Sequence, residues 1–277
     1  MLYLCATPIG NLEDMTFRVL DTLKNVDLIA AEDTRNSIRL LNHFEIRTPM
    51  TSYHEYNRVE KAHDLIRQMQ EGKDVALITD AGTPAISDPG ETLVALCQEA
   101  GITVTSLPGA AACITALTLS GLSTRRFCFE GFLPAEKKER RAVLAELIQE
   151  SRTMILYEAP HHLVRTLQEL RDALGDRRVT LCRELTKKFE TVTPTTLEEA
   201  LSYYEEEEPR GEYVLVLEGK GLNAKREEAA LAWQEMPIEE HMKYYEEQGV
   251  DRKEAMKLVA KDRGIGKREV YQMLLGR

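Results

Sequence analysis

Short apolar segments alternate with amphipathic segments along the first half of the chain, and this alternation limits the possible folds more than any other feature. Four apolar runs have the length of buried strands: "LYLCA" (2–6), "VDLIAA" (26–31), "DVALI" (74–78) and "ITVTSL" (102–107). Residues 56–72 repeat apolar side chains with helical spacing from Val59 to Met69 and end at Gly72. Buried strands that alternate with glycine-terminated helices predict an α/β domain with a largely parallel sheet.

The same pattern starts again near residue 122. Four runs resemble strands: "RFCFEGF" (126–132), "TMILYEA" (153–159), "RVTLCRE" (178–184) and "EYVLVLEG" (212–219). Helical patterns lie between them at 137–150 and 161–175. We therefore expect a second α/β domain, and we place the domains at 1–121, 122–221 and 222–277.

The last part of the chain lacks any run that resembles a strand. Apolar residues around Val259 and Val270 flank the sequence Gly264-Ile265-Gly266, which predicts a helix-turn-helix in an all-helical module. Residues 252–277 hold eight basic and three acidic side chains, a net charge of +5, whereas residues 223–251 have a net charge of −5. A basic end suits contact with phosphates, but a solvated helical bundle fits the pattern equally well.

Composition excludes several classes of protein. The formal net charge of −10 argues against a protein that coats nucleic acid, although a local basic site stays possible. Five scattered cysteines, an odd number without CxxC spacing, favour reduced thiols in a cytosolic protein over a disulfide framework or a zinc site, and we expect no metal. We expect no signal peptide and no membrane span, since no apolar run approaches ~18–20 residues.

Glycine- and proline-containing loops follow the predicted strands at 6–14, 79–90 and 107–112, and another precedes the last strand at 210–212. Ligands of open α/β sheets bind at the carboxyl ends of strands, so these loops predict a site for a nucleotide-like ligand; ordinary turns are the alternative. The loops carry acidic side chains such as Asp80 and Asp88 but no lysine. A nucleoside with a positive charge, such as S-adenosylmethionine, therefore fits better than a polyphosphate.

Two polar clusters have both a functional and a structural interpretation. Glu32, Asp33 and Arg35 follow a strand and could face a substrate, or Asp33 could cap the next helix, and both can hold together. His54 could take part in acid–base chemistry or could be a hydrogen-bonded loop histidine. A hydrolase is disfavoured because no GxSxG motif is present.

Seven motifs in order resemble a known family. They are "LCATPIGNLEDMTFRVLDTL" (4–23), "AEDTR" (31–35), "DAGTPAISDPG" (80–90), "LPGAAACITALTLSGL" (107–122), "FEGFLPAEKKERR" (129–141), "YEAPHH" (157–162) and "ELTKKFE" (184–190). Together they resemble bacterial methyltransferases of small-subunit ribosomal RNA, within the tetrapyrrole-methylase-like superfamily. The C-terminal helices resemble a small module of that family, so the resemblance covers nearly the whole chain.

The resemblance implies two α/β domains of the tetrapyrrole-methylase type with S-adenosylmethionine in the cleft between them. It implies a homodimer in the cytoplasm that methylates the ribose 2′-oxygen of a cytidine in the decoding region of 16S rRNA, within the small ribosomal subunit. The cofactor residues that it implies are Pro8, Gly10, Asp80, Ala81, Gly82, Thr83, Pro84, Pro108, Gly109, Ala110, Ala111, Ala112, Tyr157, Glu158, Arg183, Glu184, Gly211, Glu212 and Tyr213.

Methyl transfer to a ribose hydroxyl needs positioning of the two atoms and gains from a base that takes the proton. The candidate bases are Glu32, Asp33 and His54, and Asn11 and Arg35 are candidates for holding ribose or phosphate. The candidate RNA contacts are Lys137, Lys138, Arg140, Arg141, Lys187, Lys188, Lys267 and Arg268.

Two other functions stay open on the sequence alone. A small-molecule methyltransferase of the tetrapyrrole type would share fold and cofactor, but the helix-turn-helix and "AEDTR" argue against it. A non-catalytic nucleic-acid-binding regulator would use the helix-turn-helix, but the loops at the strand ends argue against that.

Overall fold

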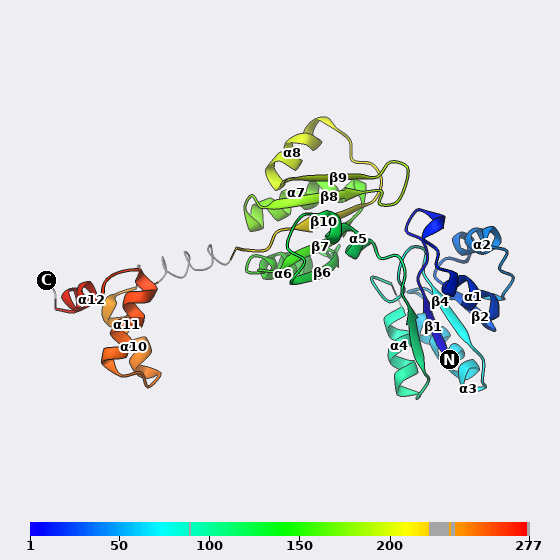
Figure 1. The fold of residues 1–277 in the computed structure, drawn as a ribbon, viewed down its shortest axis with the longest axis horizontal. Coiled ribbons are helices and arrows are strands. Elements are labelled where there is room, and N and C mark those ends of the chain that lie inside the picture. Colours follow the sequence, from blue (N-terminus) through cyan, green and yellow to red (C-terminus); the bar gives the residue numbers. More distant parts are fainter. Residues whose placement is uncertain (89, 222–232, 234–235, 276–277) are drawn as a thin grey trace. The chain divides into compact units, whose positions relative to one another are not determined.

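The computed structural model describes residues 1–88, 90–221, 233 and 236–275. The chain divides into two compact units, one formed by residues 1–148 and 152–218 and the other by residues 149–151 and 219–277 (Figure 1). The larger unit contains two five-stranded sheets. No helix in the described ranges has both the length and the apolar character needed to cross a membrane.

The first sheet has the strand order β3-β2-β4-β1-β5 and is parallel throughout. Its strands are β1 (Leu2–Cys5), β2 (Leu28–Ala31), β3 (Met50–Ser52), β4 (Val75–Ile78) and β5 (Val104–Leu107). The helices that connect them are α1 (Phe17–Asn25), α2 (Thr34–His43), α3 (Arg58–Gln70) and α4 (Gly90–Glu99), with a 3-10 helix, η1 (Leu12–Asp14), before α1.

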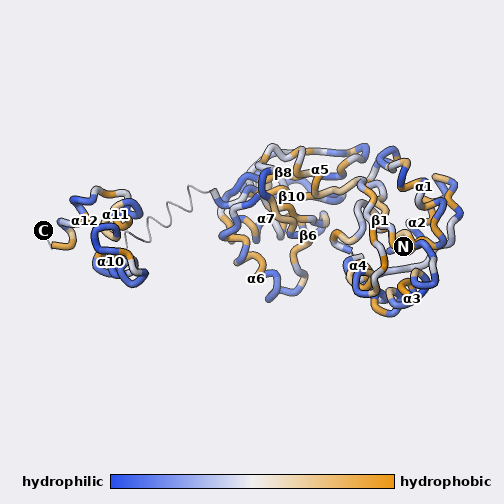
Figure 2. Tube along the Cα trace, turned by 60° about the horizontal axis from the view of Figure 1, so that its bottom comes forward, coloured by the Kyte–Doolittle hydropathy of each residue, from blue (hydrophilic) through white to orange (hydrophobic). Residues whose placement is uncertain are grey.

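Helices cover both faces of this sheet. Alternate strand residues point to opposite faces, so Cys5, Ile29 and Ile78 pack with α1 and α2, whereas Leu4 and Leu77 pack with α3 and α4. The strands therefore form apolar stretches in the hydropathy trace, while the helices alternate between polar and apolar residues (Figure 2). This arrangement confirms the α/β domain that the sequence pattern predicts.

The second sheet has the order β6-β7-β10-β8-β9, and only β6 and β7 pair in parallel. Its strands are β6 (Phe127–Phe132), β7 (Thr153–Glu158), β8 (Arg178–Arg183), β9 (Thr191–Thr196) and β10 (Tyr213–Leu217). Helices α6 (Lys137–Leu147), α7 (Pro160–Leu174) and α8 (Leu197–Glu206) pack on one face.

Helix α5 (Ala112–Leu119) covers the other face of the second sheet. Its residues Cys113, Ala116 and Leu117 pack against Ile155 and Val214. The boundary proposed at residues 121 and 122 lies just after this helix, so it assigns to the N-terminal half a helix that packs on the C-terminal sheet. The loop before α5 is thereby anchored to both sheets.

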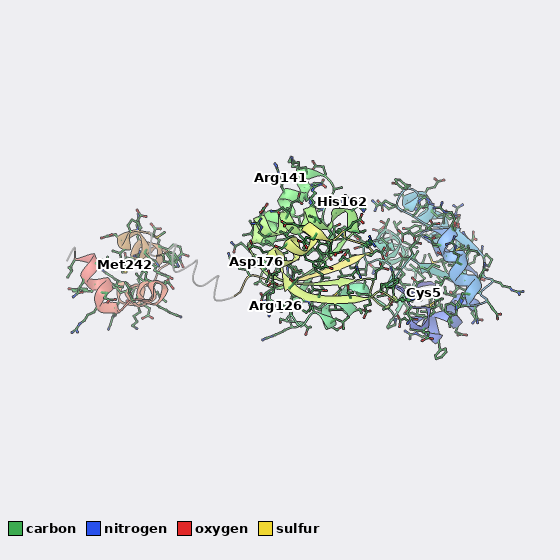
Figure 3. The ribbon with its side chains drawn as sticks, turned by 90° about the horizontal axis from the view of Figure 1, so that it is seen from above. Cys5, Arg126, Arg141, His162, Asp176 and Met242 are labelled. Atoms are coloured by element: carbon green, nitrogen blue, oxygen red, sulfur yellow. The ribbon has the colours of Figure 1, made fainter. Side chains whose placement is uncertain are left out.

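The smaller unit contains α10 (Ile238–Glu247), α11 (Arg252–Arg263) and α12 (Lys267–Leu274). Helix α11 ends at Gly264, whose φ of 64° is left-handed, and Gly266 caps α12. Val259, Ala260 and Val270 pack with Met242, which Figure 3 labels. The predicted helix-turn-helix is confirmed, while the part of the predicted module at 222–232, 234–235 and 276–277 lies outside the described residues.

Candidate active site

A cleft of about 380 Å³ lies in the larger unit, at the carboxyl ends of β1, β2, β4, β5, β6, β7 and β8. Twelve of the residues proposed as catalytic or cofactor residues line it: Glu32, Asp80, Ala81, Gly82, Thr83, Ala111, Ala112, Tyr157, Glu158, Glu184, Glu212 and Tyr213. The cleft thus draws on the loops after β2, β4 and β5 and on one edge of the second sheet. Its volume is in the range of small-molecule sites.

The loop after β4 is held by hydrogen bonds to its neighbours and within itself. Thr7 and Gly82 exchange two hydrogen bonds, N–H to O of 2.9 and 3.1 Å, and the Thr83 hydroxyl donates to the Ala110 carbonyl at 2.9 Å. The Asp88 carboxylate accepts N–H groups from Ala85 and Gly90 at 2.8 and 2.9 Å. These contacts connect the three glycine- and proline-containing loops that the sequence predicts to lie together.

Glu32 is the one candidate base that lines the cleft. Its Oε2 accepts a hydrogen bond from the Thr79 hydroxyl at 2.7 Å and a longer one from the Asp80 N–H at 3.5 Å. Thr79 is in turn fixed by Thr7, whose hydroxyl donates to the Thr79 carbonyl at 3.1 Å. The carboxylate is therefore oriented at the end of β2 by two threonines.

Asp33 takes the structural role that its position allows. It caps α2 through the Arg35 N–H at 2.8 Å and forms a bidentate pair with the Arg35 guanidinium, Oδ1 to Nε 3.1 Å and Oδ2 to Nη2 2.8 Å. The hydrogen bonds from Arg35 lower the pKa of Asp33 to about 2. Neither residue lines the cleft, so the pair stabilises the start of α2.

His54 and Asn11 also lie outside the cleft lining. The His54 backbone N–H donates to Asn57 at 2.8 Å, and its Nδ1 is buried with no hydrogen-bond partner among the described residues. The Asn11 side chain accepts the Glu13 N–H, and its backbone N–H donates to the Thr186 hydroxyl at 3.0 Å. The loop containing Gly10 therefore contacts the loop after β8.

Three charged side chains form a cluster at the rim of the second sheet. Lys187 Nζ lies 3.1 Å from both Glu184 Oε1 and Glu212 Oε2, and Glu184 Oε1 accepts the Glu212 N–H at 2.9 Å. Burial raises the pKa of Glu184, but the Glu212 N–H and the Lys187 ammonium outweigh burial and hold that pKa below its usual range. Lys187, proposed above as an RNA contact, thus lies in the cleft with its charge paired.

Gly211 makes this cluster possible. Its φ is 75°, and a Cβ on it would lie 2.6 Å from Glu184 Cγ. Replacement by alanine should lower the free energy of unfolding by about 2 kcal/mol or more, since backbone strain of about 1–2 kcal/mol adds to displacement of Glu184.

Gly121→Ala is the matched control, because φ is 69° there and a Cβ would meet no atom within 4 Å. Urea denaturation of both variants separates the two contributions. Equal losses at the two positions would show that the contact with Glu184 costs nothing.

Tyr157 and Glu158 end β7, where Tyr157 lies beside α5 and Glu158 contacts Thr166 of α7. The Tyr157 hydroxyl accepts the Cys113 N–H at 3.1 Å, and its ring packs edge-on against Phe129 and Phe132. Burial raises the pKa of Tyr157, so its phenol stays neutral. Glu158 is 5% exposed, and its Oε1 accepts the Ala159 N–H at 2.8 Å.

Eight of the proposed cofactor residues do not line the cleft: Pro8, Gly10, Pro84, Pro108, Gly109, Ala110, Arg183 and Gly211. Most of them lie in the loops that support it. Arg183 differs, because it alternates with Cys182 along β8 and so faces the opposite side of the sheet, where it lines another pocket with Tyr203 and Tyr204. The structure therefore places Arg183 outside the cleft, contrary to the prediction.

The sequence interpretation missed eleven residues of the cleft as ligand contacts: Ile9, Thr79, Ile86, Ser87, Asp88, Phe132, Ala159, Cys182, Leu185, Lys187 and Val214. Several of them had a signal, because Thr79 directly follows β4 and Phe132 ends β6, and strand ends are where ligands bind. The apolar residues among the eleven had no signal in the sequence other than their position next to such residues.

The proposed RNA contacts divide by exposure. Lys137, Lys138, Arg141, Lys188 and Arg268 are exposed, Lys267 is half-buried, and Figure 3 shows Arg141 at the outer side of α6. Arg140 is 7% exposed and bonds Thr166 and Glu169, because it shares the buried face of α6 with Leu144 and Leu147. The prediction that Arg140 contacts RNA at the surface is therefore wrong, because Arg140 is an interior residue.

The class of protein follows from a family model and from the similarity of the fold to known structures. The family model of Tetrapyrrole (Corrin/Porphyrin) Methylases matches residues 1–201. The fold resembles the crystal structures of diphthine synthase (TM-score 0.60, 14% identity, 82% of this chain and 93% of that one) and of uroporphyrin-III-C-methyltransferase from Thermus thermophilus (TM-score 0.56, 18% identity, 81% and 95%). Fold and family therefore define a methyltransferase, and the non-catalytic alternative is not retained.

Closer relatives narrow the assignment. The chain is 48% identical to the "Ribosomal RNA small subunit methyltransferase I" of Halalkalibacterium halodurans over 98% of its own length and 93% of that protein. It is 46% identical to the protein of the same name in Bacillus subtilis, over 98% and 92%. The chain belongs to the ribosomal RNA small subunit methyltransferase I family.

Proposed function

We propose that this chain transfers the methyl group of S-adenosylmethionine to the ribose 2′-oxygen of a cytidine in the decoding region of 16S rRNA. The names of the relatives support ribosomal RNA of the small subunit as the substrate. The resemblance of the motifs supports the cytidine and its 2′-oxygen. It also leads us to propose a homodimer that acts in the cytoplasm on the assembled subunit.

The charge of the cleft is the observation that supports this methyl donor. Six carboxylates line it (Glu32, Asp80, Asp88, Glu158, Glu184 and Glu212) against one ammonium, that of Lys187, which two of them already pair. A polyphosphate would be repelled, whereas a nucleoside with a sulfonium and an ammonium group would be attracted. Apolar side chains such as Ile9, Leu185 and Val214 suit the uncharged parts. The residues present therefore fit S-adenosylmethionine.

S-adenosylmethionine supplies an electrophilic methyl group on a cationic sulfur. The residues of this chain must place the ribose hydroxyl and remove its proton. We propose Glu32 as the base, because its carboxylate lines the cleft and is held by Thr79. The loops after β4 and β5 and the residues Tyr157, Glu158, Glu184, Glu212 and Tyr213 would hold the methyl donor.

We assign RNA contacts to basic side chains in both units. In the larger unit they are the exposed side chains of Lys137, Lys138 and Arg141 on α6 and of Lys188 after β8, and in the helix-turn-helix they are Lys267 and Arg268. The net charge of −10 predicts weak binding to RNA in general, so that the shape of the small subunit would supply most of the specificity.

The test incubates the protein with methyl-labelled S-adenosylmethionine and unmethylated small subunits. We expect the label at one cytidine whose linkage resists alkali, because a 2′-O-methyl group blocks cleavage. Label in an alkali-labile nucleotide would refute 2′-oxygen chemistry. Unlabelled RNA with the methyl donor still bound would direct the search to small-molecule acceptors, and failure to bind the donor would refute the proposed cofactor.

A further inference from the structure

A chain of hydrogen bonds runs from the cleft into the interior through Glu158, Thr166 and Arg140. The Thr166 hydroxyl donates to Glu158 Oε2 at 2.5 Å, and Arg140 Nη2 donates to Thr166 Oγ1 at 2.6 Å. Glu158, Thr166 and Arg140 are 5%, 0% and 7% exposed. Only Glu158 of the three lines the cleft, so the other two reach a ligand through it.

The donors and acceptors fix the direction of every bond. A guanidinium has N–H donors and no acceptor, so Thr166 Oγ1 accepts from Arg140. The single hydroxyl proton of Thr166 then points to Glu158 Oε2, while the Ala159 N–H points to Oε1 at 2.8 Å. Both oxygens of Glu158 face donors from the protein. A ligand group that contacts this side chain must therefore also be a hydrogen-bond donor.

Arg140 is held in place by contacts on the side away from Thr166. Its Nε donates to the Glu169 carboxylate, which also pairs with Arg165 at 3.0 Å, and its Nη1 lies 3.5 Å from the Leu133 carbonyl. Burial raises the pKa of Glu169, but the two guanidiniums outweigh burial and keep that pKa below its usual range. A fixed positive charge therefore lies two hydrogen bonds behind the Glu158 carboxylate and offsets part of the cost of burying it.

We infer that Thr166 and Arg140 are positioning residues that present Glu158 to the methyl donor as an acceptor for its hydroxyl or ammonium groups. The inference rests on the proposed function, since it concerns the donor's place in the same cleft. It assigns a role to two residues of α6 and α7 that do not line the cleft themselves.

The first experiment compares Thr166→Val with Thr166→Ser. Valine keeps the shape and removes the hydroxyl, so binding of S-adenosylmethionine, measured by calorimetry, should weaken about tenfold, as expected for loss of a hydrogen bond to a charged group. The KM for the donor should rise by the same factor while kcat stays near that of the unchanged protein. Serine keeps the hydroxyl and should restore binding. Unchanged binding in Thr166→Val, or loss of kcat alone, would overturn the inference.

A double-mutant cycle tests whether Thr166 acts through Glu158. Glu158→Gln places an amide where two donors need acceptors, and it should weaken donor binding. Adding Thr166→Val in that background should weaken binding no further; a second tenfold loss would show that Thr166 acts only by packing. If Thr166→Val does not fold, Arg140→Lys replaces it in the cycle with the same two outcomes. If the unchanged protein binds no S-adenosylmethionine, the proposed function fails instead.

Discussion

Replacing Glu32 with glutamine should lower kcat for methylation of small-subunit RNA by about 10²–10⁴-fold, the range that a positioned base contributes. Glutamine keeps an oxygen that can accept the Thr79 hydroxyl, so the local structure should survive. It cannot take the proton of the ribose hydroxyl. Single-turnover rates with saturating donor and subunits measure the effect, and donor binding by calorimetry checks that the cleft is intact.

Two matched controls come from the other candidate bases. Asp33→Asn keeps an N-cap of α2, and Asp33 does not line the cleft, so the rate should change little. His54→Ala should also leave the rate nearly unchanged, because His54 does not line the cleft. If Glu32→Gln retains the full rate, positioning alone carries the reaction and no base is needed. A large loss of rate in Asp33→Asn would instead identify Asp33 as the base, although it does not line the cleft.

Periodicity predicted the long elements well because one physical cause dominates them. Helices α3, α6 and α7 bury one face of regular spacing, and β4 and β10 are buried along their whole length. Strands β3 and β9 were missed for the opposite reason. Strand β3 has three residues and none is fully buried, while β9 is a threonine-rich edge strand that contains Pro194.

The loops of the site could be predicted because strand ends and glycines mark them, but the direction of single side chains could not. Arg140 appears basic and exposed within "KKERR", yet helical spacing with Leu144 and Leu147 turns it inward. Arg183 directly precedes Glu184 in the run "RVTLCRE" (178–184), yet it faces away from the cleft. In both cases the residue type suggests a role at the surface or at a ligand. The actual role depends on the direction of the side chain, which changes from one residue to the next along a helix or strand.

Neutralising Lys267 and Arg268 together should weaken binding to the small subunit by about tenfold or more at 0.15 M salt and leave donor binding unchanged. Each lost phosphate contact should reduce the slope of log affinity against log salt by about 0.7–0.9. The donor site should not respond, because its residues all lie in the larger unit. Filter binding of subunits to the Lys267→Gln/Arg268→Gln variant across salt concentrations measures both effects.

Lys243→Gln is the matched control, because it removes a single charge from α10 in the same unit, where Lys243 pairs with Glu247 at 3.6 Å. Its salt slope should equal that of the unchanged protein, whereas Lys267→Gln and Arg268→Gln taken singly should each lower it. Equal slopes for all three variants would mean that the charge of the helix-turn-helix attracts RNA without touching it. The exposed basic side chains of the larger unit would then be the ones that contact phosphates, and Arg141→Gln should show the loss instead.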